Sequence, residues 1–247
     1  MPLEAQKCEL SHVTVFRSLF LQEANTQIRH NACHERGWSD SYLLSLEGTP
    51  VGYGSVKGQD VPDRDTIFEF YVSPSHRKWA SPLFQKLIAA SAVKFIECQS
   101  NDSLLQSMIF EFSENIHSPV ILLSDLASTN LVVPEVVFRK KLQGDVLFKH
   151  RHEPEGSHII VTKEEVVATG GFMLHYNAPF ADLFMEVKED ARKRGVGSYL
   201  IQELKRECYL AGRVPAARCN IENMASRATL LKAGMKIAGF MLIGTIR

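Results

Sequence analysis

The chain has 247 residues, 45% of them hydrophobic, and its 28 basic and 28 acidic residues give a formal net charge of zero. This balance gives no overall attraction to nucleic acid or to a membrane surface, so recognition by charge must come from local clusters. Its five cysteines show no paired spacing, and neither a signal peptide nor an apolar run of 18 residues is present, so we expect a reduced cytoplasmic protein.

The first half of the chain predicts strands and helices in alternation. Phe16, Leu19 and Phe20 have helical spacing, which places a helix over 13–28. Gly48 and Pro50 are turn formers between two apolar-rich runs and predict a hairpin. The hairpin strands are expected near 41–46 and 51–57, followed by a strand at 66–72, a helix opening at Pro82, a strand at 93–98, a helix at 101–115 and a strand at 119–126.

The second half repeats this order. Its elements are predicted as a hairpin at 157–174, a strand at 181–187, a helix at 198–211, a strand at 216–219, a helix at 224–232 and a strand at 236–246. Along 198–211, Leu200, Leu204 and Cys208 line one face, and the polar residues take the other. Asn223 is placed as an N-cap. The repeat predicts two tandem α+β domains, residues 1–127 and 128–247.

The two halves can be aligned residue by residue at one loop. Residues 72–77 lie opposite 187–192, at a constant offset of 115. Beyond that point Gly195 faces Ala80 and Gly197 faces Pro82. The second copy therefore keeps two glycines that the first copy lacks.

The loop that follows residue 187 has the composition of a phosphate site. A strand that ends in a glycine-rich turn and feeds a helix exposes backbone N–H groups at the positive end of the helix dipole. The sequence lacks the GK[ST] of a P-loop and the third glycine of a dinucleotide fingerprint. What remains is Arg192-x-x-Gly195-x-Gly197, the pattern of an acyl-CoA pyrophosphate site.

This pattern and the later segment 223–235, NMASRATLLKAGM, resemble the GCN5-related N-acetyltransferases (GNAT). The resemblance is strong over 157–247 and weaker over 40–126. It implies two GNAT-like domains with mixed, mostly antiparallel sheets flanked by helices, and acetyl transfer from the cosubstrate acetyl-CoA to an amine by direct attack in a ternary complex. The residues that it assigns to the cosubstrate are Met185, Val187, Arg192, Lys193, Arg194, Gly195, Val196, Gly197, Ser198 and Asn223.

The same comparison marks the first copy as degenerate. Pro82 has no N–H to donate, and Ala80 adds a Cβ at the crowded point. We expect this copy to bind acetyl-CoA weakly or not at all.

Proton transfer is less well defined by the sequence. An acceptor amine must lose a proton, and Glu186 is the best candidate base, with Asp182 and His175 as weaker substitutes. Leu230 stands where many family members carry a tyrosine that protonates the departing thiolate. Tyr176 and Tyr199 are the remaining candidates for this acid, or the thiolate leaves unassisted. Cys219 is better explained as a small residue in a buried strand than as the nucleophile of a covalent route.

Other polar residues are weaker candidates. His150 and His152 lack further ligands at metal spacing, so no metal site is expected. Glu23, Trp38 and Asp40 are candidates for an acceptor pocket. The acceptor can be a small-molecule amine or a peptide. The sequence does not indicate an oligomeric state. Two alternatives to the enzyme are a non-catalytic acyl-CoA sensor and an interaction module.

Overall fold

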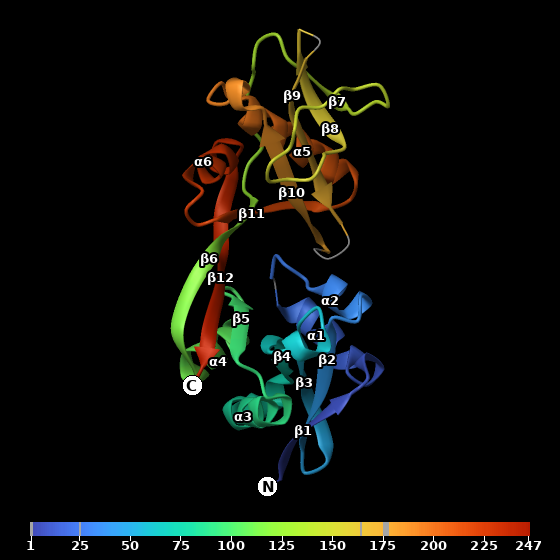
Figure 1. The fold of residues 1–247 in the computed structure, drawn as a ribbon. Coiled ribbons are helices and arrows are strands. Elements are labelled where there is room, and N and C mark those ends of the chain that lie inside the picture. The colour runs from blue at the N-terminus through green and yellow to red at the C-terminus, as the bar shows by residue number, and fades with distance from the viewer. Residues whose placement is uncertain (1, 25, 164, 175–177) are drawn as a thin grey trace. The chain divides into compact units, whose positions relative to one another are not determined.

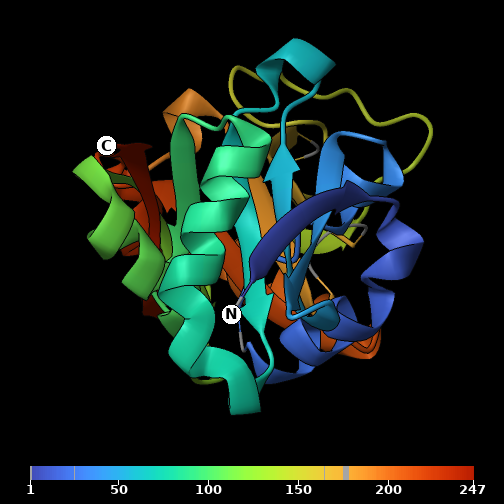
Figure 2. The same cartoon turned by 90° about the horizontal axis from the view of Figure 1, so that it is seen from below.

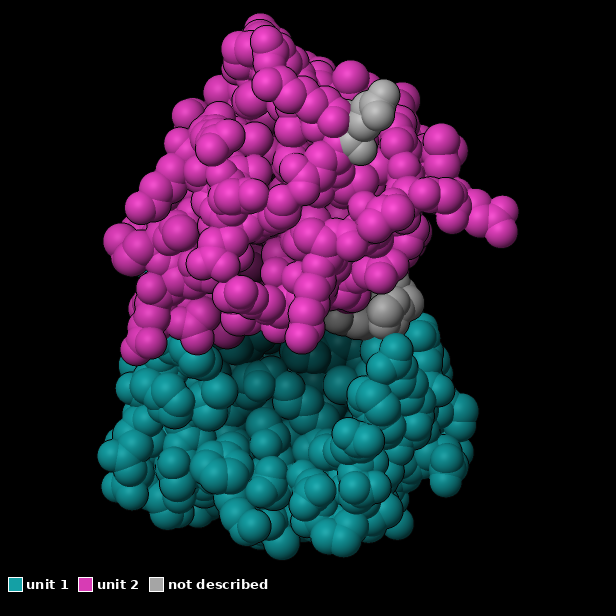
Figure 3. Space-filling view, turned by 45° about the horizontal axis from the view of Figure 1, so that its top comes forward, with its two compact units in different colours: residues 1–119, 239–247 teal, residues 120–238 magenta. Residues whose placement is uncertain are grey.

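The computed structural model describes residues 2–24, 26–163, 165–174 and 178–247. They form two compact units, which Figure 3 shows in different colours. Unit 1 comprises residues 1–119 and 239–247, and unit 2 comprises residues 120–238. Each unit combines a mostly antiparallel sheet with helices, which confirms the predicted α+β class.

Unit 1 contains a sheet with the strand order β1-β2-β3-β4-β5-β12 (Figure 1). All its printed pairs are antiparallel except β4 with β5, which is parallel. Helix α3 runs beside strand β1, as Figure 2 shows. The elements are β1 Leu3–Cys8, α1 Thr14–Glu23, α2 Asn31–Glu35, β2 Ser39–Leu46, β3 Thr49–Lys57, β4 Thr66–Val72, α3 Ala80–Ser91, β5 Phe95–Gln99 and α4 Ser103–Phe112.

The core of unit 1 is built from alternate strand positions and from one face of α3 and α4. Phe70 on β4 meets Phe84 on α3 edge to face, with ring centroids 4.8 Å apart. Burial of such side chains supplies the main stabilisation, about 25 cal/mol per Å² of apolar surface removed from water. The fully buried members of this cluster include Leu44, Ile67, Phe70, Leu83, Phe84, Leu87, Ile96, Leu105 and Ile109.

Unit 2 has the strand order β6-β11-β10-β9-β8-β7 (Figure 1). Its long helix α5 packs on strands β8 to β11. As in unit 1, one pair in the middle, β10 with β11, is parallel. The elements are β6 Ser113–Asp125, β7 Val137–Lys140, β8 His158–Thr162, β9 Glu165–Met173, β10 Phe180–Val187, α5 Val196–Leu210, β11 Val214–Asn220 and α6 Met224–Lys232. Residues 113–119 of β6 belong to unit 1, as do residues 239–246 of the last strand, β12 Met235–Ile246.

Each sheet includes a strand from a distant part of the chain. Residues 241–245 of β12 pair with residues 95–99 of β5 in unit 1. Residues 120–124 of β6 pair with residues 216–220 of β11 in unit 2. The compact units are therefore not continuous in sequence, and the division into 1–127 and 128–247 stays a prediction about the two copies.

The predicted elements agree with the structure in most places, with three omissions and several errors. Strand β1, helix α2 and strand β7 are not anticipated by the sequence pattern. The helix expected over 13–28 ends at Glu23. The helix expected at 101–115 ends at Phe112, where strand β6 follows directly. On α5, Lys205 is buried rather than exposed because its ammonium donates to the carbonyls of Ala127 and Ala233, at 2.7 and 2.8 Å.

The close packing of the C-terminal strand gives a first prediction. A Cβ on Gly244 of β12 would lie 2.7 Å from Ser113 Cβ and 3.0 Å from Ile109 Cγ1. Gly244→Ala should therefore lower the free energy of unfolding by about 1–3 kcal/mol through overpacking. Urea unfolding measures this change. Gly144→Ala is the control, because a Cβ there meets nothing within 4 Å.

Equal stability of the Gly244→Ala and Gly144→Ala variants would contradict the placement of β12 in unit 1. Amide hydrogen exchange on β5 localises the effect, since loss of β12 pairing exposes the β5 backbone.

Candidate functional site

The candidate site starts where the two parallel strands of unit 2 separate. Strands β10 and β11 pair from Phe180 with Val214 to Leu183 with Ala217. Beyond that point β10 keeps only its partner β9, up to Val187 opposite Ala168. A strand that loses one neighbour has unpaired backbone groups along that side.

The backbone groups of Met185 and Val187 face this split. The Lys188 N–H donates to the Val167 carbonyl on the β9 side, at 2.9 Å. Because successive residues of a strand point their N–H groups to opposite sides, Met185 and Val187 direct theirs away from β9. Two donors are thus available at the open edge.

The turn after β10 is held to the strand end by an arginine. Arg192 Nε donates to the Val187 carbonyl at 3.0 Å. In unit 1, Arg77 Nε donates to the Val72 carbonyl at 3.3 Å. Both partners are related by the offset of 115, so the aligned residues make the same hydrogen bond in both units.

The turn then passes through left-handed backbone before α5 begins. Lys193 has φ +60° and Gly195 has φ +84°. A residue with a Cβ is strained there, which explains the glycine at 195. At Gly197 the reason is space, because a Cβ would lie 3.1 Å from Thr229 Cγ2 and 3.4 Å from Met185 Cε.

A cavity of about 740 Å³ lies at this turn. Its volume falls within the range that holds cofactors and drug-sized molecules. The lining comes from β10, the turn, the start of α5, helix α6 and the loop before β8: His152, Glu153, Met185, Glu186, Val187, Ala191, Arg192, Lys193, Gly195, Gly197, Ser198, Asn223, Ala225, Ser226, Ala228, Thr229 and Lys232.

Helix α6 forms one wall of this cavity. Asn223 caps it, with Oδ1 accepting the Ser226 N–H at 3.0 Å, as the sequence predicts. Ser198 Oγ donates to the Thr229 carbonyl at 3.1 Å and ties α5 to α6. Leu230, at the position of the expected tyrosine, is buried.

Most residues predicted for the cosubstrate lie together. Met185, Val187, Arg192, Lys193, Gly195, Gly197, Ser198 and Asn223 all line the cavity. Arg194 and Val196 are outside the lining, Arg194 exposed and Val196 buried. Their binding roles remain predictions.

Glu186 lines the cavity, but its carboxylate is engaged. Oε1 accepts the Arg151 N–H at 3.0 Å, and Oε2 accepts those of His152 and Glu153 at 3.1 and 3.0 Å. Burial alone would raise the pKa of Glu186, but these three backbone donors outweigh it and hold the pKa below its usual range. Its role as a base stays a prediction.

The remaining candidates for proton transfer are placed as follows. Asp182 is buried and accepts from Arg218 Nε at 2.6 Å. Burial raises the pKa of the Cys219 thiol and of the Tyr199 hydroxyl. The predictions on His175 and Tyr176 lie outside the described residues.

The sequence predictions missed Glu153 and Lys232 as part of the cavity, and they set His152 aside as loop. The segment 141–157 has no hydrophobic periodicity that would place it against β10. Only the structure shows that the backbone of residues 151–153 donates to Glu186 and so lies beside the cavity.

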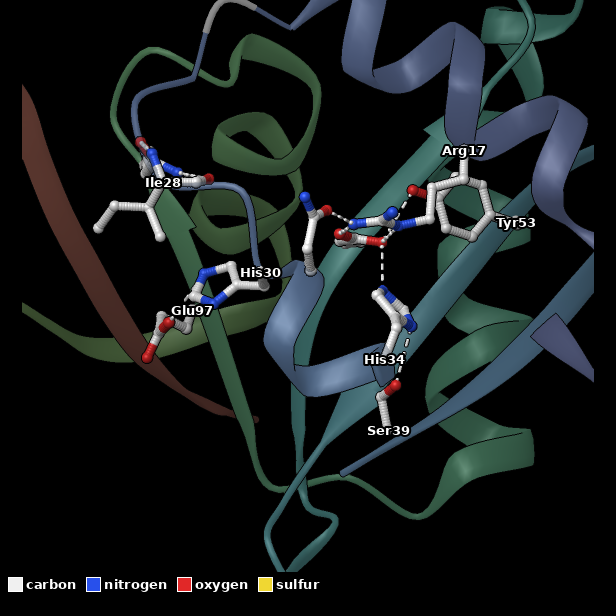
Figure 4. A network of polar contacts seen from close by, with 10 residues as sticks. Arg17, Ile28, His30, His34, Ser39, Tyr53 and Glu97 are labelled. Atoms are coloured by element: carbon white, nitrogen blue, oxygen red, sulfur yellow. Dashed lines mark hydrogen bonds and ion pairs between the residues drawn. The ribbon is translucent and has the colours of Figure 1, made fainter. Parts of the chain in front are cut away.

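Unit 1 has the same split, but its own chain fills it. Strands β4 and β5 pair only at Thr66 with Phe95 and Ile67 with Ile96. Beyond them lies Glu69, 2% exposed, which accepts from Arg17 Nε and Nη2 and from Tyr53 OH, all at 3.0 Å. Figure 4 shows these side chains converging on one carboxylate, together with His34, whose Nε2 lies 3.0 Å from Glu69.

The segment between α1 and α2 completes this filling. Gln99 Oε1 on β5 accepts the N–H groups of Gln27 and Ile28 at 2.9 and 3.1 Å, and its Nε2 donates to the Ile28 carbonyl at 2.7 Å. The cavities that border Glu69 and Phe70 are only about 10 and 60 Å³. Neither can hold a ligand the size of acetyl-CoA.

The turn of unit 1 also differs from that of unit 2. A 3₁₀ segment, Pro74–Trp79, leads directly into α3, and Ala80 has φ −58°. This turn therefore lacks the left-handed residue found at Gly195. Pro82 lies in the first turn of α3, where it offers no N–H.

The other predicted acceptor residues are engaged within unit 1. Glu23 pairs with Arg77, and Asp40 pairs with Lys7 at 2.8 Å. Trp38 lies under the Arg36 guanidinium. Across the described residues, no group of three His, Cys, Asp or Glu is arranged to hold a metal. In the same part of the chain, no helix is long and apolar enough to cross a membrane.

Comparison with protein families gives two adjacent matches. The model of the "Acetyltransferase (GNAT) family" matches residues 125–235, and that of an "Acetyltransferase (GNAT) domain" matches residues 11–125. Among curated proteins, none matches the sequence.

Solved structures share the fold over nearly the whole chain. An acetyltransferase from the GNAT family of Colwellia psychrerythraea has a TM-score of 0.75 at 13% identity, covering 99% of this chain and 100% of that one. A tandem GNAT protein from the clavulanic acid biosynthesis pathway has a TM-score of 0.58 at 10% identity, covering 99% and 98%. A GCN5-related N-acetyltransferase from Sphaerobacter thermophilus has a TM-score of 0.54 at 12% identity, covering 99% of this chain and 96% of that one.

The filled split of unit 1 generates a prediction on stability and pH. Burial would raise the pKa of Glu69, but His34 and Arg17 outweigh it and lower the pKa to about 2. The ionised carboxylate therefore stabilises the fold above its unfolded pKa of about 4.3, and this contribution is lost as pH falls towards 2. Arg17→Met should cost about 3–5 kcal/mol at neutral pH, since it leaves a buried charge without its main partner.

Urea unfolding between pH 7 and pH 2 measures both effects. The Arg17→Met variant should show a shallower loss of stability below pH 4.5 than the wild type. Lys141→Met, which removes an exposed ion pair with Glu155, serves as the control. Parallel pH curves for wild type and Arg17→Met would show that Arg17 does not hold the Glu69 charge.

Proposed function

The chain belongs to the acetyltransferase (GNAT) family, with two of its domains in tandem, and on this premise we propose that unit 2 uses acetyl-CoA to acetylate an amine. The observation that supports this proposal is the split between β10 and β11. It opens onto a cavity of about 740 Å³ beside a glycine-containing turn and a helix N-terminus.

The residues of this cavity fit the chemistry of acetyl-CoA. A pantetheine arm carries amide groups, and the backbone of Met185 and the N–H of Val187, which have no strand partner on this side, can hydrogen-bond to them. A pyrophosphate needs N–H donors and positive charge. The turn offers both through the backbone of residues 192–198 and the cations Arg192, Lys193 and Arg194, with Lys232 on the facing wall.

Two groups of the chain would act near the reacting centre. Acetyl-CoA, when bound, supplies an activated acetyl thioester. The Val187 N–H would donate to a carbonyl oxygen that gains negative charge, a contribution of about 3–4 kcal/mol for an oxyanion-hole donor. Asn223 uses Oδ1 in its cap, so its side-chain NH₂ is the part that donates to a ligand.

Unit 1 would then carry no cosubstrate. Its split holds the Glu69 network and residues 27–28, and its turn presents Pro82 where unit 2 presents Gly197. We therefore assign one acetyl-CoA site to each chain, in unit 2.

A sensor that binds acetyl-CoA without transfer is the second candidate. It is favoured by Leu230, a buried apolar side chain at the position where the resemblance expects a tyrosine acid. The acceptor of the enzyme would be a small-molecule amine or a peptide amine.

Binding and transfer give the next prediction. Acetyl-CoA at 100 times its dissociation constant should add about 2.7 kcal/mol to the stability of the wild type. Gly197→Pro should abolish this gain because it removes an N–H and adds a Cβ beside Thr229 and Met185. The proline should leave the fold intact, since the first turn of a helix tolerates it. Thermal melts measure binding, and release of free thiol with a panel of primary amines measures transfer.

Normal binding by Gly197→Pro would overturn the role of the turn. Binding without thiol release for any amine would favour the sensor. The Gly144→Ala variant, changed in a loop outside the cavity lining, is the control and should behave as the wild type.

The number of sites is a separate prediction. Isothermal titration with acetyl-CoA should give one site per chain. Two sites in the wild type, of which one survives in Gly197→Pro, would show that unit 1 opens its split to the ligand.

A further inference from the structure

One carboxylate beside the cavity accepts three hydrogen bonds from the loop before β8. Three consecutive backbone N–H groups, those of residues 151–153, donate to Glu186, which is only 7% exposed. Hydrogen bonds to an ionised acceptor are about twice as strong as neutral ones. Glu186 thus binds the loop as an anion, and gaining a proton would weaken all three bonds.

A second carboxylate is carried into the cavity by this attachment. Glu153 lines the cavity, and its backbone N–H is the third donor to Glu186. Among the described residues, no hydrogen bond or ion pair engages its side chain. The Glu153 carboxylate is therefore available to take a proton, whereas that of Glu186 is occupied.

The surroundings of Glu153 favour its protonated form more than free solution does. The Glu153 side chain remains exposed to solvent, and the partial desolvation of its carboxylate by the cavity wall is the largest cause that raises its pKa, followed by the charges of Asp182 and Glu186 on β10. Arg218 on β11 and His152 on the same loop act in the opposite direction and are outweighed. A base with a raised pKa is better matched to a neutral operating pH.

We propose that Glu153 is the proton acceptor of the reaction and that Glu186 is the positioning residue that holds it at the cavity. This inference rests on the proposed acetyl transfer. It differs from the sequence prediction, which assigned the proton to Glu186 itself.

The reaction balances as follows. An acceptor ammonium gives one proton to the Glu153 carboxylate and becomes a neutral amine. The amine nitrogen forms a bond to the acetyl carbonyl carbon, the carbon–sulfur bond breaks, and sulfur leaves with the electron pair. The second nitrogen proton ends on that sulfur as the thiol, and Glu153 returns its proton to water.

The test compares Glu153→Gln with the wild type on two kinds of nucleophile. Primary alkylamines are charged at neutral pH, whereas hydroxylamine is largely uncharged and has little need of a base. Glu153→Gln should keep acetyl-CoA binding and lose about 100-fold in kcat/KM with alkylamines, with a smaller loss for hydroxylamine. In the wild type, kcat/KM should fall as pH falls through the raised pKa of Glu153, and the variant should lack this limb.

A readout independent of turnover comes from NMR titration of ¹³C-labelled glutamate side chains, assigned by the variants. The Glu153 signal should titrate above the ordinary glutamate range and the Glu186 signal below it. Glu186→Gln should shift the amide signals of residues 151–153, because one of its two oxygens becomes an NH₂ group. Glu155→Gln, two residues along the loop and outside the cavity lining, is the matched control and should change none of these.

The outcomes separate the two proposals. No acetyl-CoA binding by the wild type overturns the proposed function. Binding without transfer to any amine overturns transfer and the role of Glu153 together, and leaves the sensor. If Glu153→Gln still transfers the acetyl group and its kcat/KM still falls with falling pH, this inference alone is overturned. If Glu186→Gln loses that pH dependence while the amide signals of residues 151–153 stay unchanged, the base is Glu186.

Discussion

The divergence of two parallel strands is the constraint on which the candidate site depends. In unit 2 the pairing of β10 with β11 stops at Leu183 and Ala217. This stop frees the backbone edge of β10, and the turn that follows brings α5 and α6 to the same place. Without the divergence, the sheet would satisfy its own hydrogen bonds and leave no polar edge for a ligand.

In unit 1 the corresponding split holds side chains of the chain itself. Its split is filled by Glu69, a buried charge that is costly unless it is paired and hydrogen-bonded. Arg17, His34 and Tyr53 meet that requirement, and Gln99 satisfies the backbone of residues 27–28. The two units therefore differ in side chains, in the segment 27–28 and in the backbone of the turn, while the strand order and the arginine at the turn are shared.

Local features of the site could be predicted from the sequence because they depend on neighbouring residues. Gly195 adopts the left-handed backbone that its position in the turn requires, and Asn223 caps α6. The exchange of strands between distant parts of the chain could not be predicted, since strand pairing carries no local signal. The burial of Lys205 could not be predicted either, because the carbonyls that accept from it, those of Ala127 and Ala233, belong to other segments. The sequence predicts Glu186 as a candidate base, but not its three backbone donors, which lie more than 30 residues away.

The most direct measurement is an NMR titration of the ¹⁵N-labelled chain with acetyl-CoA. We expect the amide signals of Met185, Val187 and residues 193–198 to shift, and those of residues 68–83 in unit 1 to stay in place. Shifts of equal size at residues 68–83, or none at residues 185–198, would contradict a single cosubstrate site in the open split of unit 2.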